Sequence, residues 1–114
     1  MITDLLDGLT VATGLEIEEN DYGGDEQEYI VYDYTDSRGG LFGDDRAQTV
    51  ETTIQLRVRL HKETDYYELK ETIWDYLEEY DFYDLSFDNY CEKEDGDVFR
   101  YLIFECSYTE QRGE

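Results

Sequence analysis

The chain has 114 residues, of which 31 are Asp or Glu and only nine are Lys or Arg, so its formal net charge is −22. A charge this negative repels phosphate backbones and excludes nucleic-acid binding through a basic face. Twelve Tyr, five Phe and one Trp supply the apolar surface that an acidic disordered tail lacks, so we expect one folded domain over residues 1–114.

The N-terminal residues show no basic segment followed by an apolar stretch, and no apolar run approaches the roughly 20 residues of a membrane span. We therefore expect a soluble protein that has no signal peptide and no membrane partner.

Residues 1–14 have the pattern of one amphipathic helix. Apolar side chains recur there at helical spacing, at Ile2, Leu5, Leu6 and Leu9. The helix is expected to end at Gly14, because glycine readily adopts the left-handed conformation of a helix stop.

Three segments precede the next regular pattern. Residues 15–17 suit a short strand, residues 20–28 an exposed acidic loop, and residues 28–35 a strand rich in Tyr. Residues 36–46 hold three glycines and charges of both signs, which predicts a mobile loop or an extended hairpin arm.

The strongest periodic signal lies in residues 48–62. Mostly apolar side chains occupy every second position from Val50 to Leu60, and polar side chains occupy the positions between them. This alternation predicts a long strand with one buried face and one solvated face.

Residues 64–82 predict a second amphipathic helix. Apolar and aromatic side chains recur at helical spacing from Tyr66 to Tyr80, and Thr64 or Asp65 is the expected N-terminal cap. Another face of this helix is acidic and consists of Glu68, Glu71, Asp75 and Glu78. Such a face is usually a solvated surface.

Two closing strands, residues 83–91 and 98–108, flank an expected turn at Asp95 and Gly96. That turn sets the pairing of the two strands on one face: Tyr83, Leu85 and Phe87 oppose Tyr108, Cys106 and Phe104. Cys91 then lies opposite Arg100 and away from Cys106, so we expect no disulfide and a reducing, cytosolic compartment.

Together these elements predict an α+β domain in the order helix, strands, long strand, helix, hairpin. Two helices are expected to pack on one face of a mostly antiparallel sheet.

The sequence shows no pattern of a catalytic, cofactor or metal site. His61 is the only histidine, and with two separated cysteines it offers too few ligands for zinc. The glycines at 23–24 and 39–43 do not match a nucleotide-binding loop, and the acidic loops at 21–28 and 92–97 lack the spacing of a calcium-binding loop. We therefore expect that the protein is not an enzyme and holds no cofactor.

The few cations are unevenly placed. Arg57, Arg59 and His61 alternate along the long strand, so they project from one of its faces, and Lys62 follows them. Two interpretations are open. The stripe pairs with acidic groups of its own chain, or it contacts an acidic surface of the next copy. A contact of the second kind closes a ring when it is repeated around an axis.

Six segments follow one another in the chain: a helix that ends in TGL, the strand YIVYDY, a polar loop, the strand TIQLRVRL, the helix ELKETIWDYLEEYDF and the strand VFRYLIFECSYTE. Their order resembles that of the tail terminator, or tail completion, proteins of long-tailed bacteriophages. The resemblance covers most of the chain and includes no catalytic motif. The chain departs from the family's usual pattern in having no proline and a large acidic excess.

The resemblance implies an α+β fold and a homo-hexameric ring at the head-proximal end of the tail tube. Such a ring stops tube growth and joins the tail to the head, so its partners would be the tail tube protein and head-tail connector proteins. The protein would then belong to a virion assembled in the host cytoplasm. An acidic lumen would let DNA pass without binding it. The family's flexible loop corresponds to residues 36–46, which makes Arg38, Phe42 and Arg46 the expected loop contacts.

Two other functions stay open. A DNA mimic that inhibits a restriction or CRISPR nuclease would array carboxylates on one surface, and the acidic helix face, continued by Asp81 and Asp84, has that character. Against a mimic, the long strand shows Thr, Gln and Arg to solvent. The third candidate is another head-tail connector or minor tail protein.

Overall fold

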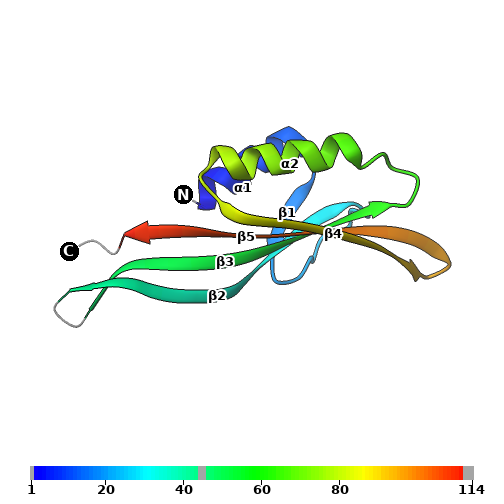
Figure 1. The fold of residues 1–114 in the computed structure, drawn as a ribbon. Helices are drawn as coiled ribbons and strands as arrows, with labels where there is room; N and C mark the ends of the chain where they lie inside the picture. The colour runs from blue at the N-terminus through cyan, green and yellow to red at the C-terminus, as the bar shows by residue number, and fades with distance from the viewer. Residues whose placement is uncertain (1, 44–45, 112–114) are drawn as a thin grey trace.

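We describe the protein from a computed structural model, which covers residues 2–43 and 46–111. Within these residues, two helices and five strands follow one another along the chain (Figure 1). They are α1 (Ile2–Thr13), β1 (Glu16–Glu19), β2 (Tyr29–Gly43), β3 (Arg46–His61), α2 (Tyr67–Glu79), β4 (Tyr83–Glu94) and β5 (Asp97–Gln111).

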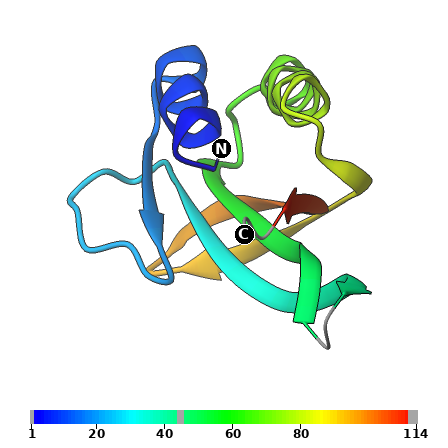
Figure 2. The same cartoon turned by 90° about the vertical axis from the view of Figure 1, so that its left-hand side faces the viewer.

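The strands form one sheet in the order β1-β2-β3-β5-β4. Only the pairing of β1 with β2 is parallel, and the other three pairings are antiparallel. Both helices lie over the same face of this sheet, as the end-on view in Figure 2 shows. The predicted α+β class and the one-sided helix layer are therefore confirmed. In the described part of the chain, no helix is long and apolar enough to cross a membrane.

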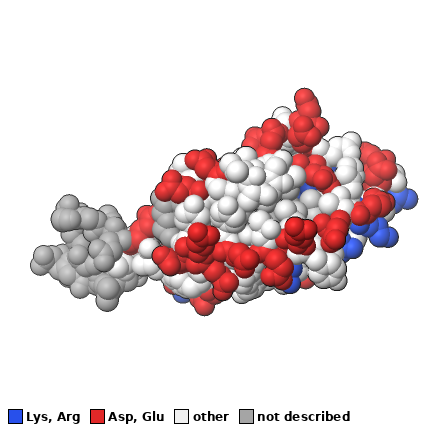
Figure 3. All heavy atoms as spheres, turned by 90° about the horizontal axis from the view of Figure 1, so that it is seen from above, with Lys and Arg blue, Asp and Glu red and all other residues white. Residues whose placement is uncertain are grey.

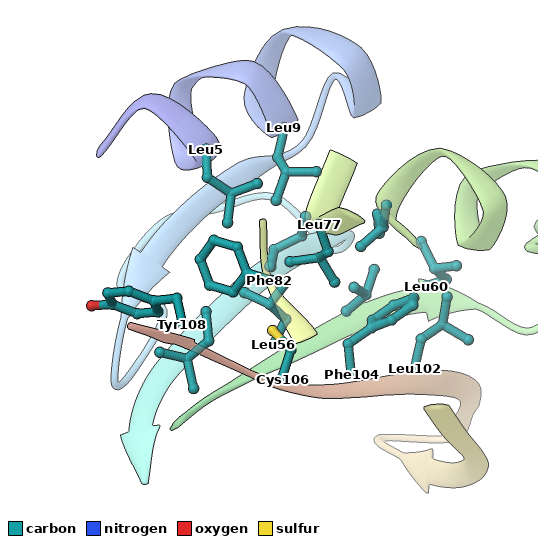
Figure 4. Packing of buried hydrophobic residues seen from close by; sticks show 14 residues of the cluster. Leu5, Leu9, Leu56, Leu60, Leu77, Phe82, Leu102, Phe104, Cys106 and Tyr108 are labelled. Carbon is teal, nitrogen blue, oxygen red and sulfur yellow. The ribbon is translucent and has the colours of Figure 1, made fainter. Parts of the chain in front are cut away.

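The core lies between the helix layer and the sheet. Leu5 and Leu9 of α1 and Leu77 of α2 point down toward Leu56 and Phe104 of the sheet (Figure 4), and all five are completely buried. Removing side chains of this size from water stabilises a fold by about 1.5–3 kcal/mol each. These contacts supply the apolar burial that the acidic composition makes scarce.

The predicted alternation of the long strand is confirmed in β3. Thr52, Ile54, Leu56, Val58 and Leu60 are buried on the helix-bearing face, while the residues between them are partly exposed on the other face. This second face carries no helix, and we call it the helix-free face.

The helix ends follow local chemistry. Gly14 lies at φ +73°, and its N–H donates to Thr10 O at 2.9 Å, so it ends α1 as expected. The predicted cap of α2, Thr64 or Asp65, is wrong: the N-cap residue is Tyr66, which makes no side-chain capping hydrogen bond. Asp65 lies one residue earlier, and its Oδ1 accepts a hydrogen bond from the N–H of Tyr67 at 3.0 Å. Thr64 donates its hydroxyl hydrogen to Glu28 Oε2 at 2.6 Å.

The closing hairpin confirms part of the predicted register. Asp95 and Gly96 both have positive φ and form its turn, and Phe87 lies opposite Phe104 with ring centroids 5.1 Å apart. Cys91 lies opposite Arg100, and both cysteines are free, as expected.

The predicted pairing of Tyr83 with Tyr108 is wrong. Asp84 adopts φ +54° at a shift of register, so Tyr83 lies opposite Ser107. The Tyr83 hydroxyl therefore reaches the helix-free face, where it donates to Glu51 Oε2 at 2.6 Å. Phe82 takes the place beside Tyr108 in the core, with ring centroids 5.0 Å apart.

Of residues 36–46, those that the structure describes, 36–43 and Arg46, belong to a long β2–β3 hairpin, which matches the extended arm that was one of the two expectations. Pairing continues out to Gly43 and Arg46. β1 stops opposite Tyr32 and β4 begins opposite Ser107, so the sheet narrows from five strands to three toward this end. We call this narrowed part the wing; it comprises residues 36–43, 46–53 and 108–111 and projects past the helices (Figure 1). Its third strand, β5, is paired with β3 out to Gln111, opposite Thr49, and only β2 and β3 are paired beyond that level within the described residues.

We expect Gly14→Ala to lower the free energy of unfolding by about 1–2 kcal/mol, because a Cβ at positive φ clashes with the backbone. Gly23→Ala is the matched control: both glycines have open space around them, but only Gly14 has a positive φ. Urea denaturation measures both values. Equal losses in the two variants would contradict a backbone cause.

We also expect stability to fall at alkaline pH. Burial raises the pKa of the Cys106 thiol from 9.0 to about 12, and burial also raises the pKa of the Tyr108 hydroxyl to about 12. Because these pKa values are higher in the folded state, their full contribution is present below about pH 9 and is lost as the pH rises toward 12.

Urea midpoints measured from pH 7 to 11 test this expectation, with Cys106→Ala as the variant that removes the thiol. A wild-type midpoint that is flat to pH 9 and then falls, with a smaller fall in the variant, is the expected result. A midpoint that stays flat to pH 11 would contradict it.

Candidate assembly surface

Arg59 is the best-held cation of the predicted stripe. Its side chain is only 17% exposed on the helix-free face, and its Nη2 donates to Glu94 Oε1 at 2.7 Å. Its guanidinium also lies 3.7 Å from the ring centroid of Phe99 and 5.5 Å from that of Tyr29. Ionic and cation–π contacts of this kind indicate that Arg59 stabilises the folded monomer.

The carboxylate of Glu94, which accepts the hydrogen bond from Arg59, also accepts one from a tyrosine. The hydroxyl of Tyr101 donates to Glu94 Oε2. Burial, followed by this bond to a carboxylate, raises the pKa of Tyr101. Glu94 thus fixes two side chains of β3 and β5 from the end of β4.

Arg57 is held more loosely on the same face. Its Nη2 lies 3.2 Å from Asp33 Oδ2 and 3.4 Å from the carbonyl oxygen of Asn20, and its side chain is 38% exposed. Surface pairs of this geometry stabilise a protein by less than about 1 kcal/mol.

His61 and Lys62 lie at the end of β3 away from the wing, in the part of the molecule that carries the helices, which we call the body. The N–H of His61 donates to Glu28 Oε2 at 2.9 Å, and the imidazole ring lies 5.1 Å from the ring of Phe99. Lys62 is exposed, and its backbone N–H donates to Val98 O at 3.2 Å.

The side chains of Arg57, Arg59 and His61 thus make contacts within their own chain, and the side chain of Lys62 is exposed. For Arg57 and Arg59 the structure shows the first of the two interpretations, pairing with acidic groups of the same molecule. A role of Arg57, Arg59, His61 and Lys62 between copies stays a prediction, and Lys62 has the most exposed side chain of the four.

The expected loop contacts lie in the wing. Arg38 is exposed, and its Nε donates to Asp36 Oδ2 at 2.7 Å. The backbones of Phe42 and Arg46 are paired with Ala47 and Gly43, but their side chains lie outside the part of the chain that the structure describes.

Charge is unevenly distributed over the helix-bearing side. Figure 3 shows acidic side chains along both long sides of this view, while the largest group of visible Lys and Arg atoms lies at the end away from the wing. Among the exposed acids are the four expected on α2: Glu68, Glu71, Asp75 and Glu78. The expected solvated face of this helix is confirmed.

Two hollows of the described surface have several acidic side chains in their lining. One of them, about 580 Å³, is lined by Asp25, Glu26, Glu28 and His61 among others. No group of three metal-ligating side chains occurs among the described residues. A hollow of about 100 Å³ between Arg57, Arg59 and Tyr101 also contains Asp21, and the arginines there are already paired with carboxylates.

The wing carries a feature that sequence reasoning missed, its two open edges. β1 pairs only with residues 29–32 of β2, and β4 reaches only Ser107 of β5. On their outward sides, residues 33–43 of β2 and 108–111 of β5 therefore have no strand neighbour within the described chain. Open edges offer unpaired N–H and C=O groups to another strand. The lack of proline in residues 33–43 agrees with such pairing, but no sequence pattern shows where β1 and β4 stop.

No protein-family model matches the chain, and a search of curated proteins found no significant match. Its function therefore has to be inferred from its own surface and topology.

We expect Arg59→Ala to lower the free energy of unfolding by about 2 kcal/mol and Arg57→Ala by about 0.5 kcal/mol, because only Arg59 is both largely buried and packed on rings. Urea denaturation at pH 7 measures both. Small, equal losses would show that Arg59 does not hold the helix-free face. Reversal of both residues to Glu is a poor assembly test, because it places new carboxylates beside Asp33 and Glu94.

Proposed function

We propose that the protein is a structural subunit of a bacteriophage tail that assembles into a ring, caps the tail tube and joins the tail to the head. The observation that carries this proposal is the wing, a three-stranded extension open on both sides. It is suited to association with other chains and has no evident part in a chemical reaction. The helices and strands named in the resemblance to tail terminators occur in the same order in the chain, although most of the polar loop expected between two of them is the paired arm of β2 and β3.

The charge distribution supports a conduit for DNA. Arg57 and Arg59 are paired with carboxylates of their own chain, so they offer no free cationic site to a phosphate. Surfaces of the same sign as DNA repel it, which lets DNA pass without adhesion.

The same charge makes association between copies costly. Each copy carries −22, and the arginines of the stripe are not free to neutralise a neighbour. Salt screens repulsion between exposed charges, with a Debye length of about 10 Å at 0.1 M. We therefore expect rings to form more readily as the salt concentration rises.

One observation favours a DNA mimic as the second candidate. Glu68, Glu71, Asp75 and Glu78 form an exposed acidic row on α2, and Asp81 and Asp84 beyond the helix are exposed as well. A mimic needs this row to contact a basic nuclease, whereas a ring held by its wings does not. A head-tail connector or minor tail protein remains a third candidate, since it too would assemble.

Light scattering after size exclusion, at 0.1 M and 1 M NaCl, tests the proposed function. The expected result is one closed oligomer that gains population with salt and shows a central hole in negative-stain images. It should not retard duplex DNA in a gel. The matched control variant, Glu68→Gln with Glu71→Gln and Asp75→Asn, should assemble at least as well, because it removes only negative charge.

A protein that stays at the 13.6 kDa of one chain under both conditions would contradict a ring. Tight binding of such a monomer to a basic nuclease, lost in the α2 variant, would establish the mimic instead.

A further inference from the structure

The two open edges of the wing lie at the same level of the sheet. Arg38 of β2 is in register with Glu51 of β3, and Glu51 is in register with Thr109 of β5. Arg38 and Thr109 thus mark one level on opposite edges, and both residues are exposed. A copy placed beside the wing at that level would bring one open edge next to the other.

The strand directions suit this placement. β2 and β5 are both antiparallel to β3, so they run in the same direction, toward the end of the wing. Rotation about an axis keeps that direction the same in every copy when the strands run along the axis. β5 of one copy would then add to β2 of the next as a parallel strand, with regular main-chain hydrogen bonds.

Charge favours the wing over the other edges of the sheet. At the body, the β1 edge carries Glu16, Glu18 and Glu19, and the β4 edge carries the exposed Asp84, Asp88 and Glu92. Like charges directly opposite one another destabilise strand pairs.

At the wing, the charges are fewer and partly cancelled. Asp36 and Arg38 neutralise each other across 2.7 Å, and Glu110 is the only Asp or Glu in residues 108–111. The wing edges therefore meet with less repulsion than the body edges.

We propose that neighbouring copies of this chain join wing to wing, with the open edge of β2 accepting β5 of the next copy. This inference rests on the proposed ring and names its contact. The sheet is wider in the body, with five strands, than in the wing, with three. Wings can therefore touch only if the bodies lie farther apart than the wings. A ring in which the wings point toward one another and the bodies lie outside has this geometry. Six wings would close about 18 strands, a number at which barrels enclose a water-filled channel.

The placement also decides which face lines the channel. The helices cover one face of the sheet (Figure 2), so the helices lie outside and the helix-free face lies inside. Glu51 and Glu105 belong to that inner face, in register with Thr109 and Gln55. The bore of the ring is therefore polar and acidic.

Engineered disulfides test the contact. In a Cys91→Ser background, Arg38→Cys combined with Thr109→Cys should cross-link neighbouring copies on mild oxidation, at the salt concentration where rings form. Denaturing gels without reductant should show a ladder that ends at the closed oligomer. Each single variant should give no ladder, because a heterologous contact needs one cysteine from each edge.

The matched control is Glu18→Cys with Asp88→Cys. These residues also lie at one level on opposite edges, through Val31, Arg57 and Ile103, but at the body. Hydrogen exchange of the unmodified protein gives an independent measure: backbone amides in residues 33–39 and 108–111 should gain protection in the ring relative to the monomer.

Rings that form without a wing cross-link, or with the control cross-link alone, would overturn the wing contact and leave the proposed function standing. Dimers from the Arg38→Cys single variant would instead show a two-fold pairing of β2 with β2, which also overturns the inference. Absence of any oligomer would overturn the proposed function together with it.

Discussion

The pairing of Arg59 with Glu94 is the interaction on which the helix-free face depends. Three strands meet there: Arg59 comes from β3, Glu94 from β4, and Tyr101, which shares the same carboxylate, from β5. Phe99 lies against the guanidinium and also against His61. In a chain with nine cations against 31 acids, a largely buried arginine offsets repulsion where the strands converge, and the apolar core on the other face can then close the sheet against the helices.

The same placement limits what the surface can do. Arg57 and Arg59 cannot neutralise a partner without leaving Asp33 and Glu94 unpaired, and an unpaired carboxylate that is partly buried destabilises the fold. Attraction between unlike charges is thus a weak basis for association between copies. The alternation that put these cations on one face was visible in the sequence. Their partners were not, because Asp33 and Glu94 lie 24 and 35 residues away in the chain, and a single sequence does not reveal which distant acids a strand meets.

Local chemistry was predictable and long-range geometry less so. The alternation of β3, the helical spacing of α2, the stop at Gly14 and the Asp95-Gly96 turn all arise within a few residues, and each is present in the structure. Tyr83 was misplaced because Asp84 takes a positive φ, a conformation that aspartate tolerates and that sequence spacing does not signal. One such residue moves a side chain to the opposite face. The open edges escaped prediction for a related reason, since they depend on where β1 and β4 stop.

An acidic subunit that associates with itself and must not hold DNA faces two opposed demands. Basic side chains would favour association between the copies, but they would also bind DNA. Main-chain hydrogen-bonding groups at a sheet edge carry no net charge, so they can join the copies without attracting DNA. The wing is where this chain exposes such groups and where its edge charges are fewest: Asp36 and Arg38 cancel each other, and Glu110 is the only Asp or Glu in residues 108–111. Each kind of group would then have a separate role. Arg57 and Arg59 stabilise the monomer, the carboxylates face solvent and DNA, and the backbone groups of the wing edges join the copies.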